Sequence, residues 1–75
     1  MLYTDEAPED FLIDINSATS EQLQALYRIG PALAQKIIEY RDSYGYFATI
    51  EEIKEVSGIG DKTYEKIKDH IKAEQ

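Results

Sequence analysis

The sequence predicts an all-α domain in which four short helices form two helical hairpins behind an extended N-terminal arm. The first observation is an internal repeat, because residues 29–38 and 59–68 carry nearly the same pattern thirty positions apart. The second is a glycine, Gly30 or Gly60, that interrupts each copy directly before an apolar helical stripe. One hairpin this short cannot bury its own apolar face, so we expect the two copies to pack about a pseudo-twofold axis.

Composition narrows the possibilities further. A chain of 75 residues that is 43% apolar is expected to form one small globular domain. It contains no cysteine, which excludes disulfides and cysteine-based zinc sites, and its one histidine, His70, argues against histidine-based metal sites and catalysis. We therefore expect no cofactor, no bound metal and no small-molecule substrate.

The N-terminal segment differs in charge from the rest of the chain. Residues 1–24 hold six acidic residues and no basic one, whereas residues 25–75 hold nine acidic and eight basic residues. Residues 1–10 are predicted to be an acidic, flexible leader, and residues 11–75 the folded domain. The leader lacks the basic start of a signal peptide and no apolar run is long enough to span a bilayer, so no membrane contact is expected from this segment.

The arm follows the leader. Phe11, Ile13 and Ile15 alternate with other residues as in a β-strand. Because no second strand is evident, we predict an extended arm that lies across the helices and ends in an Asx-type turn at Asn16.

The first repeat begins with a capping box, because Thr19 is followed three residues later by Gln22. The capping box predicts a helix over residues 20–26. Gly30 ends that helical pattern, and Pro31 suits the first position of a second helix over residues 31–43. The residues expected to face inward are Leu23 and Leu26 in the first helix, and Leu33, Ala34, Ile37, Ile38 and Tyr40 in the second.

The second repeat follows an aromatic connector in which Gly45 is expected to form a left-handed C-cap. Thr49 and Glu52 make a second capping-box pattern, which predicts a helix over residues 50–56. A last helix is predicted over residues 61–72. The residues expected to face inward are Ile50, Ile53 and Val56 in the third helix, and Tyr64, Ile67 and Ile71 in the fourth.

The repeated glycine turn has a chemical consequence. It exposes the N-terminus of the following helix, where unpaired N–H groups and a partial positive charge attract anions. Glycine lets a bulky anion such as phosphate approach the backbone closely. Contacts of this kind reach the sugar-phosphate backbone of a nucleic acid and carry no base-sequence information. Two such turns related by a pseudo-twofold axis could each hold one strand of a duplex across the minor groove.

Several motifs in order resemble those of a known family. Gly58-Ile59-Gly60 and its near-copy Arg28-Ile29-Gly30 are each followed by a helix with a lysine directly before an inward isoleucine. They resemble the paired helix-hairpin-helix module of DNA repair and recombination proteins. The order of residues 13–18, 23–26, 29–34, 37–41 and 45–47 is similar to that in the C-terminal domain of ComEA-like competence DNA receptors. The likeness covers about residues 13–71 and implies a tandem helix-hairpin-helix fold.

The resemblance also implies a function, namely binding of double-stranded DNA without sequence preference during DNA uptake. Carried over by position, the phosphate-binding amides are those of Gly30, Gly58 and Gly60, and the helix-borne lysines are Lys36, Lys62 and Lys66. A ComEA-like parent protein would present the domain on the extracellular or periplasmic face of the membrane, whereas a chain that is complete as given would be cytoplasmic.

Two residues depart from the family pattern. Arg28 stands where the first turn usually has its first glycine, and it would compromise the turn if that position requires a positive φ. The guanidinium of Arg28 could still bind a phosphate. Asp61 directly follows Gly60, so its carboxylate would lie where a phosphate should arrive.

Another function stays open on the sequence alone. The net charge of −7, together with Arg28 and Asp61, favours a protein-interaction or scaffolding module that keeps the fold without binding DNA. The lysines of residues 62–72 alternate with acidic residues at spacings of three and four, which is also typical of a salt-bridged, solvated face. No enzymatic activity is expected, because no carboxylate has an apolar setting that would shift it toward neutrality.

Two further expectations concern side chains of the first repeat and the connector. Arg41 is expected to lay its stem over the core and to pair with a carboxylate or a helix end. Tyr44 and Tyr46 are expected to pack in the connector rather than to stack on nucleic-acid bases.

Overall fold

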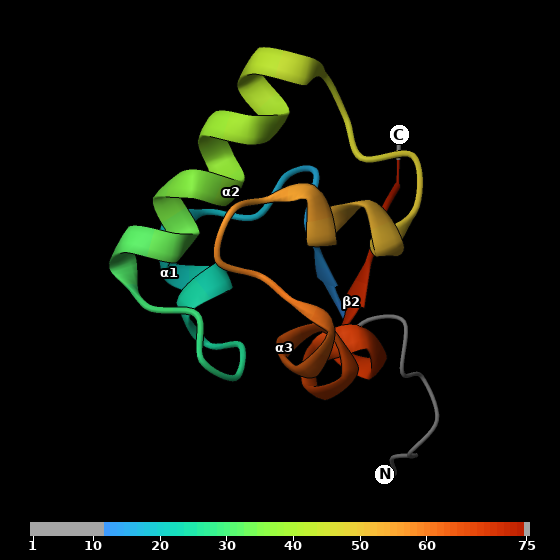
Figure 1. Ribbon diagram of the computed structural model, residues 1–75. Coiled ribbons are helices and arrows are strands. Elements are labelled where there is room, and N and C mark those ends of the chain that lie inside the picture. The colour runs from blue at the N-terminus through green and yellow to red at the C-terminus, as the bar shows by residue number, and fades with distance from the viewer. Residues whose placement is uncertain (1–11, 75) are drawn as a thin grey trace, which may run out of the picture.

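The computed structural model describes residues 12–74, and its helices follow the predicted order of two hairpins (Figure 1). The first hairpin spans residues 20–44 and the second spans residues 50–67. The predicted leader and Phe11 lie outside the described residues. The elements are β1 (Ile13–Asp14), α1 (Ser20–Gln24), α2 (Pro31–Tyr44), the 3-10 helix η2 (Ile50–Glu55), α3 (Asp61–Ile67), the 3-10 helix η3 (Lys68–His70) and β2 (Ile71–Lys72).

The two turns inside the hairpins, turn one (residues 27–30) and turn two (residues 57–60), have matching backbone conformations. Gly30 has φ −93° and ψ −172°, and Gly60 has φ −100° and ψ −169°. The Ala34 N–H donates to the Gly30 carbonyl at 2.9 Å, and the Tyr64 N–H donates to the Gly60 carbonyl at 3.0 Å. Positions thirty residues apart therefore have equivalent structure, which confirms the internal repeat.

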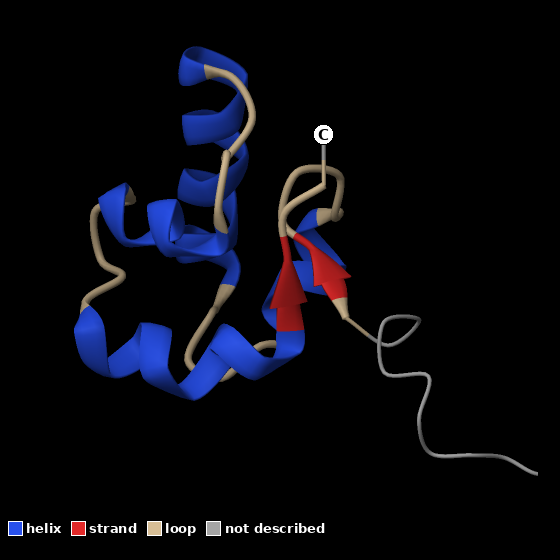
Figure 2. Ribbon diagram, turned by 90° about the vertical axis from the view of Figure 1, so that its right-hand side faces the viewer, coloured by secondary structure: helices blue, strands red, loops and turns tan. Residues whose placement is uncertain are grey.

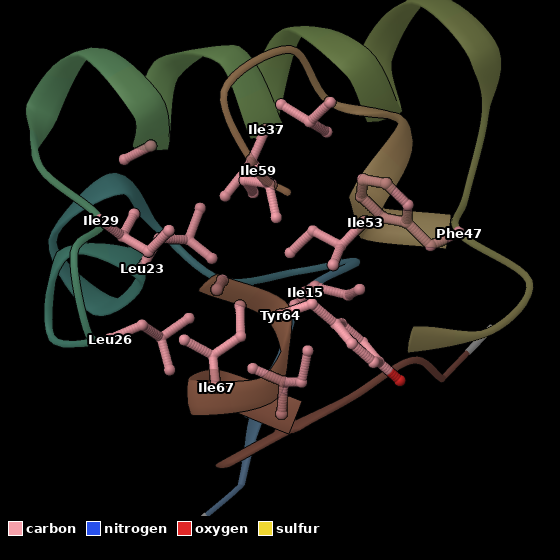
Figure 3. Packing of buried hydrophobic residues seen from close by; sticks show 14 residues of the cluster. Ile15, Leu23, Leu26, Ile29, Ile37, Phe47, Ile53, Ile59, Tyr64 and Ile67 are labelled. Carbon is pink, nitrogen blue, oxygen red and sulfur yellow. The ribbon is translucent and has the colours of Figure 1, made fainter. Parts of the chain in front are cut away.

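The hydrophobic core lies between the two hairpins and takes side chains from both (Figure 3). Every residue predicted to face inward is buried or packs against this core. The middle residues of the two turns, Ile29 and Ile59, are each only 3% exposed, so each turn is anchored to the core. The largest fully buried side chains are Phe47, Ile15, Leu23, Ile37, Ile53 and Ile67.

The first hairpin forms much as predicted. The hydroxyl of Thr19 accepts from the Gln22 N–H at 3.1 Å, and the Gln22 side chain accepts from the Thr19 N–H at 2.9 Å, so the capping box is confirmed. α1 is two residues shorter than predicted and ends at Gln24, whereas α2 runs to Tyr44. Gly45 then ends α2 with a positive φ of 92°, as predicted, but its ψ of −175° is extended, so the left-handed C-cap conformation that was predicted does not form.

The start of the second hairpin differs from the prediction. The segment from Ile50 to Glu55 is a 3-10 helix, and Thr49 makes no side-chain cap bond. The carboxylate of Glu52 instead accepts from the N–H of Ala48, one residue before the predicted partner. The capping box predicted here is therefore wrong. The Glu52 N–H donates to the Thr49 carbonyl at 3.2 Å, a bond between residues three apart that is typical of the 3-10 winding.

The predicted last helix over residues 61–72 is wrong in its C-terminal part. α3 ends at Ile67, η3 follows, and the chain then extends into β2. β2 pairs in parallel with β1, with Ile71 opposite Ile13, so the arm has a partner strand that was not predicted (Figure 2). Ile71 is 3% exposed and β-branched, and its burial beside β1 outweighs the modest helix propensity of this segment.

Asn16 joins three distant parts of the chain. It is 7% exposed, its side-chain oxygen accepts from the Phe47 N–H at 2.7 Å, and its Nδ2 donates to the Phe47 and Glu74 carbonyls at 3.0 and 2.9 Å. The predicted Asx turn lies two residues earlier, where the Asp14 carboxylate accepts from the Asn16 N–H at 3.0 Å. Asn16 is therefore a buried residue whose hydrogen bonds hold the arm, the connector and the C-terminal segment together.

Arg41 fastens the same arm to α2. Its two terminal nitrogens donate to the carbonyls of Ile15 and Ala18 at 2.9 and 2.8 Å. The side chain is half-buried, as predicted, but its partners are backbone carbonyls of the arm rather than a carboxylate or a helix end. Arg41 therefore has a structural role in this fold.

Candidate nucleic-acid interface

Each turn leads into a helix that no side chain caps. The N-cap residues of α2 and α3 are Gly30 and Gly60, and neither makes a side-chain cap bond, whereas Thr19 caps α1 with its hydroxyl. The first N–H groups of a helix have no partner within the helix. At the starts of α2 and α3 these groups therefore stay open to an outside acceptor.

The fold itself does not require either of these glycines. Their φ angles of −93° and −100° are accessible to any residue, and a Cβ added to either would meet no atom within 4 Å. Serine, threonine, aspartate and asparagine are preferred at N-caps because their side chains bond the first-turn N–H groups. Both repeats thus leave open space and uncapped amides at the same place, which suits a bulky anion such as phosphate.

The position two residues before each N-cap does require a positive φ. Gly58 has φ 104°, and a Cβ there would lie 2.9 Å from Cδ1 of Leu33. Its counterpart Arg28 has φ 64° and is the one residue other than glycine with a positive φ in the described part of the chain. Turn one forms despite the departure that was expected to compromise it. The residue equivalent to Leu33 beside turn one is the smaller Thr63, which leaves more room for an arginine Cβ.

Three basic side chains gather at turn one, which lies beside α3 (Figure 1). Arg28 comes from the turn, and Lys62 and Lys66 come from α3. A pocket of ≈ 280 Å³ is lined by these three residues with Tyr27 and Thr63, and none of its described lining residues is acidic. We call Arg28, Lys62 and Lys66 the turn-one cluster.

Tyr27 contacts both Arg28 and Lys66 of the turn-one cluster, and it was not among the site residues predicted from the sequence. Its ring centroid is 5.6 Å from the guanidinium carbon of Arg28 and 5.7 Å from Nζ of Lys66, within the range of cation–π interactions. The Arg28 Nε donates to the Tyr27 hydroxyl at 3.5 Å, and this bond with the nearby positive charge lowers the pKa of Tyr27. The position of Tyr27 directly before Arg28, in a turn expected to be exposed, could have indicated from the sequence that it belongs to the site.

Turn two has mixed charge. The pocket beside it, of ≈ 220 Å³, is lined by Lys36 and Glu39 of α2 and by Ser57, among other residues. Asp61, directly after Gly60, has a side chain that is 90% exposed, and its carboxylate lies 3.5 Å from Nζ of Lys54. A phosphate that approaches turn two would therefore meet a carboxylate as well as amines.

The two equivalent lysines, Lys36 and Lys66, serve opposite turns. Lys36 is on the first repeat but lines the pocket with Ser57 of turn two. Lys66 is on the second repeat but lines the pocket with Arg28 of turn one. Each lysine lies beside the other repeat's turn because the second helix of each hairpin packs against the turn of the other hairpin. The predicted site residues therefore fall into two groups rather than one.

The expected salt-bridged face is only partly present. Lys68 lies 3.0 Å from Glu65, which raises the pKa of Lys68, and Lys72 lies 3.2 Å from Glu74. Lys62 and Lys66 make no ion pair within residues 12–74. The two lysines of α3 that face turn one are therefore available to an outside anion.

The connector tyrosines differ from the expectation. Tyr44 is 75% exposed and Tyr46 is 65% exposed, whereas the neighbouring Phe47 is fully buried. Tyr40 bridges the two environments, with its ring 4.7 Å from that of Tyr44 and 5.1 Å from that of Phe47. The prediction that both tyrosines pack in the connector is therefore wrong for Tyr46, whereas Tyr44 is exposed but keeps a ring contact with Tyr40.

The described residues hold few other chemical features. Across residues 12–74, no three His, Cys, Asp or Glu side chains come together in a way that could hold a metal ion. The same residues contain no helix of the length and apolarity needed to cross a membrane.

Comparisons with known proteins agree with this architecture. A family model described as "Helix-hairpin-helix motif" matches residues 10–72. The chain is 53% identical over 60 residues to ComE operon protein 1 of Bacillus subtilis (strain 168), which covers 80% of this chain and 29% of that protein. It is 42% identical over 60 residues to an uncharacterized protein of Haemophilus influenzae, covering 79% of this chain and 54% of that one.

A similar domain occurs within much longer proteins. The human endonuclease/exonuclease/phosphatase family domain-containing protein 1 is 39% identical over 59 residues, which are 79% of this chain and 10% of that protein. The chain thus spans only about a third to a half of the two bacterial relatives and a tenth of the human one. The family match and the likeness to ComE operon protein 1 confirm the predicted ComEA-like tandem domain, and the chain belongs to the helix-hairpin-helix family.

Proposed function

We propose that the domain binds the sugar-phosphate backbone of double-stranded DNA without sequence preference. The observation that carries this proposal is the repeated uncapped helix start. Gly30 and Gly60 stand where the fold would accept a capping residue, and both leave open space in front of the helix amides. A phosphate oxygen is the kind of acceptor that such a place suits.

The residues around the turns have separate roles in this proposal. The amides at Gly30, Gly58 and Gly60 donate to phosphate oxygens. Arg28, Lys62 and Lys66 neutralise phosphates at turn one, where no described lining residue is acidic. Lys36 acts alone at turn two, next to Glu39. Phosphate contacts of this kind position a protein on a duplex without reading its sequence.

The paired arrangement suits a duplex better than a single strand. Two turns of the same backbone conformation are related by the repeat, and the two strands of a duplex are themselves related by twofold symmetry. Each turn would hold one strand across the minor groove. Because few phosphates are neutralised, we expect weak binding with a shallow dependence on salt.

We further propose that the parent protein uses this domain in competence-type DNA uptake, on the outer face of the cytoplasmic membrane. The support is the 53% identity to ComE operon protein 1, of which the chain covers 29%. The domain needs no catalytic group for such a role. Its task would be to hold DNA.

The second candidate is a protein-interaction module that keeps the fold without DNA. Two observations favour it: the carboxylate of Asp61 stands at turn two, and Tyr44 and Tyr46 are exposed at 75% and 65%. Exposed tyrosines are common at protein interfaces. A measurement on DNA separates the two candidates.

The test is fluorescence anisotropy of a labelled duplex of about 20 base pairs, titrated at low and near-physiological salt. Lys66→Glu should weaken binding about tenfold, because it reverses a charge in the turn-one cluster. Lys68→Glu is the matched control, since it makes the same charge change at a lysine already paired with Glu65, and it should cost about twofold. Two duplexes of different sequence should bind equally.

One outcome would overturn the proposal. If none of the proteins binds the duplex at low salt while circular dichroism shows intact helices, the domain does not bind DNA and the protein-interaction candidate stands. An equal loss in Lys66→Glu and Lys68→Glu would instead reject turn one as the site.

A further inference from the structure

A groove lies beside turn one, between the start of β1, the end of α1 and α3. Its volume is ≈ 510 Å³, and Ile13, Ala25, Leu26, Tyr27, Lys66 and His70 line it. Three of these residues are aliphatic, and none of the described lining residues is acidic. The groove is therefore an apolar surface with a basic edge.

This groove is continuous with the candidate DNA site. Tyr27 and Lys66 line both the groove and the pocket that holds Arg28 and Lys62. A single surface thus runs from Ile13, at the start of β1, to the turn-one cluster. We call it the turn-one surface.

The segment that precedes Ile13 in the sequence has the opposite charge to this surface. Residues 1–11 contain four acidic residues, Asp5, Glu6, Glu9 and Asp10, and no lysine, arginine or histidine. They also contain Leu2, Tyr3 and Phe11, which could occupy an apolar groove. The described chain begins at Leu12, so the acidic segment is attached one residue before Ile13. Eleven residues span up to roughly 36 Å when extended, which is ample to pass along the groove and reach turn one.

We propose that residues 1–11 dock on the turn-one surface and compete with DNA for the turn-one cluster. Acidic side chains would take the place of phosphates on Arg28, Lys62 and Lys66, and apolar side chains would fill the groove lined by Ile13 and Leu26. The functional consequence, autoinhibition, rests on the proposed DNA binding. The docking itself does not depend on DNA binding.

The attachment of the segment makes it a more effective occupant than a second copy of the protein. A short tether holds its acidic residues at an effective concentration on the order of millimolar. A second copy carries the same net charge of −7 and is repelled. If the segment covers the surface about four-fifths of the time, the apparent affinity for DNA falls about fivefold.

The test uses the full chain with neutral isosteres in place of the four acidic residues: Asp5→Asn, Glu6→Gln, Glu9→Gln and Asp10→Asn. The matched control makes the same change in net charge at exposed residues that line none of these pockets: Asp42→Asn, Glu51→Gln, Glu55→Gln and Asp69→Asn. Amide chemical shifts are recorded without DNA, at two protein concentrations. Affinity for the duplex is then measured at low salt.

We expect the shifts of Tyr27, Arg28 and Lys66 to change in the first variant, to stay in place in the control, and to be independent of protein concentration. We expect the first variant to bind the duplex about fivefold more tightly than the control. In a chain that also carries Arg28→Ala, Lys62→Ala and Lys66→Ala, this advantage should disappear, because the cluster that both ligands share is gone.

Each contrary outcome has its own meaning. Unchanged shifts at turn one would overturn the docking, and shift differences that depend on concentration would assign the surface to a second copy instead. Altered shifts without duplex binding by any variant would keep the docking and reject the proposed DNA function. Equal gains in affinity for both variants would show a general charge effect and overturn the autoinhibition.

Discussion

Turn one and turn two share a backbone and differ in what surrounds it. Turn one has Arg28 at φ 64° and no acidic residue among its described lining residues, whereas turn two has Gly58 at φ 104°, with Glu39 and Asp61 close by. The shared geometry comes from the buried isoleucine of each turn and from the positive φ two residues before its N-cap. The charges come from exposed positions that packing leaves free, so one scaffold carries a basic turn and a mixed one.

The comparison also shows what a glycine does at different places in one turn. The fold requires a glycine at position 58, because the backbone there has a positive φ and a Cβ would clash with Leu33. Neither reason applies to Gly30 and Gly60, where a Cβ would meet no atom within 4 Å, and the proposed function uses that open space for a phosphate.

The largest difference is expected between Gly58→Ala and Arg28→Ala. Gly58→Ala places a Cβ at φ 104° and 2.9 Å from Leu33, so it should lower the free energy of unfolding by about 2–3 kcal/mol. Arg28→Ala keeps a Cβ at a positive φ that the turn already accepts, and it should cost less than about 0.5 kcal/mol. Urea denaturation measures both.

A double variant isolates the contact. Leu33→Ala should cost stability alone but should cost less in the Gly58→Ala chain, because it removes the clash. Additive losses would show that backbone strain, not Leu33, requires the glycine.

The next difference concerns the helix starts. Thr19→Ala removes the hydroxyl that caps α1 and should cost about 1 kcal/mol, whereas Thr49→Ala removes a hydroxyl that makes no cap bond and should cost less than about 0.3 kcal/mol. Thermal or urea unfolding gives the comparison. Equal losses would mean that Thr49 caps its helix in solution.

The charge difference is tested at Asp61. Asp61→Asn removes the carboxylate beside Gly60 and releases Lys54, so it should tighten duplex binding about threefold at low salt. Glu65→Gln makes the same charge change at the partner of Lys68 and should alter binding less. If the two variants bind alike, turn two does not contact DNA.

The smallest expected effect is on the titration of Tyr27. The hydrogen bond and charge of Arg28 favour the phenolate, so the pKa of Tyr27 should lie below its ordinary value and should rise in Arg28→Ala. Because the folded state has the lower pKa, this contribution to stability is present at a pH above the tyrosine titration and is lost as the pH falls through it. Carbon NMR of the Tyr27 ring against pH measures the shift, and Lys36→Ala, at turn two, should leave it unchanged.

The sequence by itself determined the repeat, the two hairpins and the core positions, whereas the residues of the candidate site remain a prediction. Those features depend on local patterns: glycine and proline at helix boundaries, a capping box at Thr19, and apolar residues at helical spacing. Each of these local patterns spans only a few residues of the chain. The structure confirms the repeat, the hairpins and the core positions.

The tertiary structure alone decided how the ends and the turns meet. Ile71 leaves the helical pattern because β1, nearly sixty residues earlier, offers it a partner and a buried position. Asn16 links three segments by hydrogen bonds because Phe47 and Glu74, which are distant in sequence, lie beside it in the folded protein.

The grouping of the basic residues was also invisible in the sequence. Lys36 and Lys66 are equivalent in the repeat, which suggests that they act together. In the structure, each of them lies beside the turn of the other repeat. Tyr27 gained its place between Arg28 and Lys66 in the same way. Contacts between distant segments depend on how the helices pack, and local spacing carries no information about that packing.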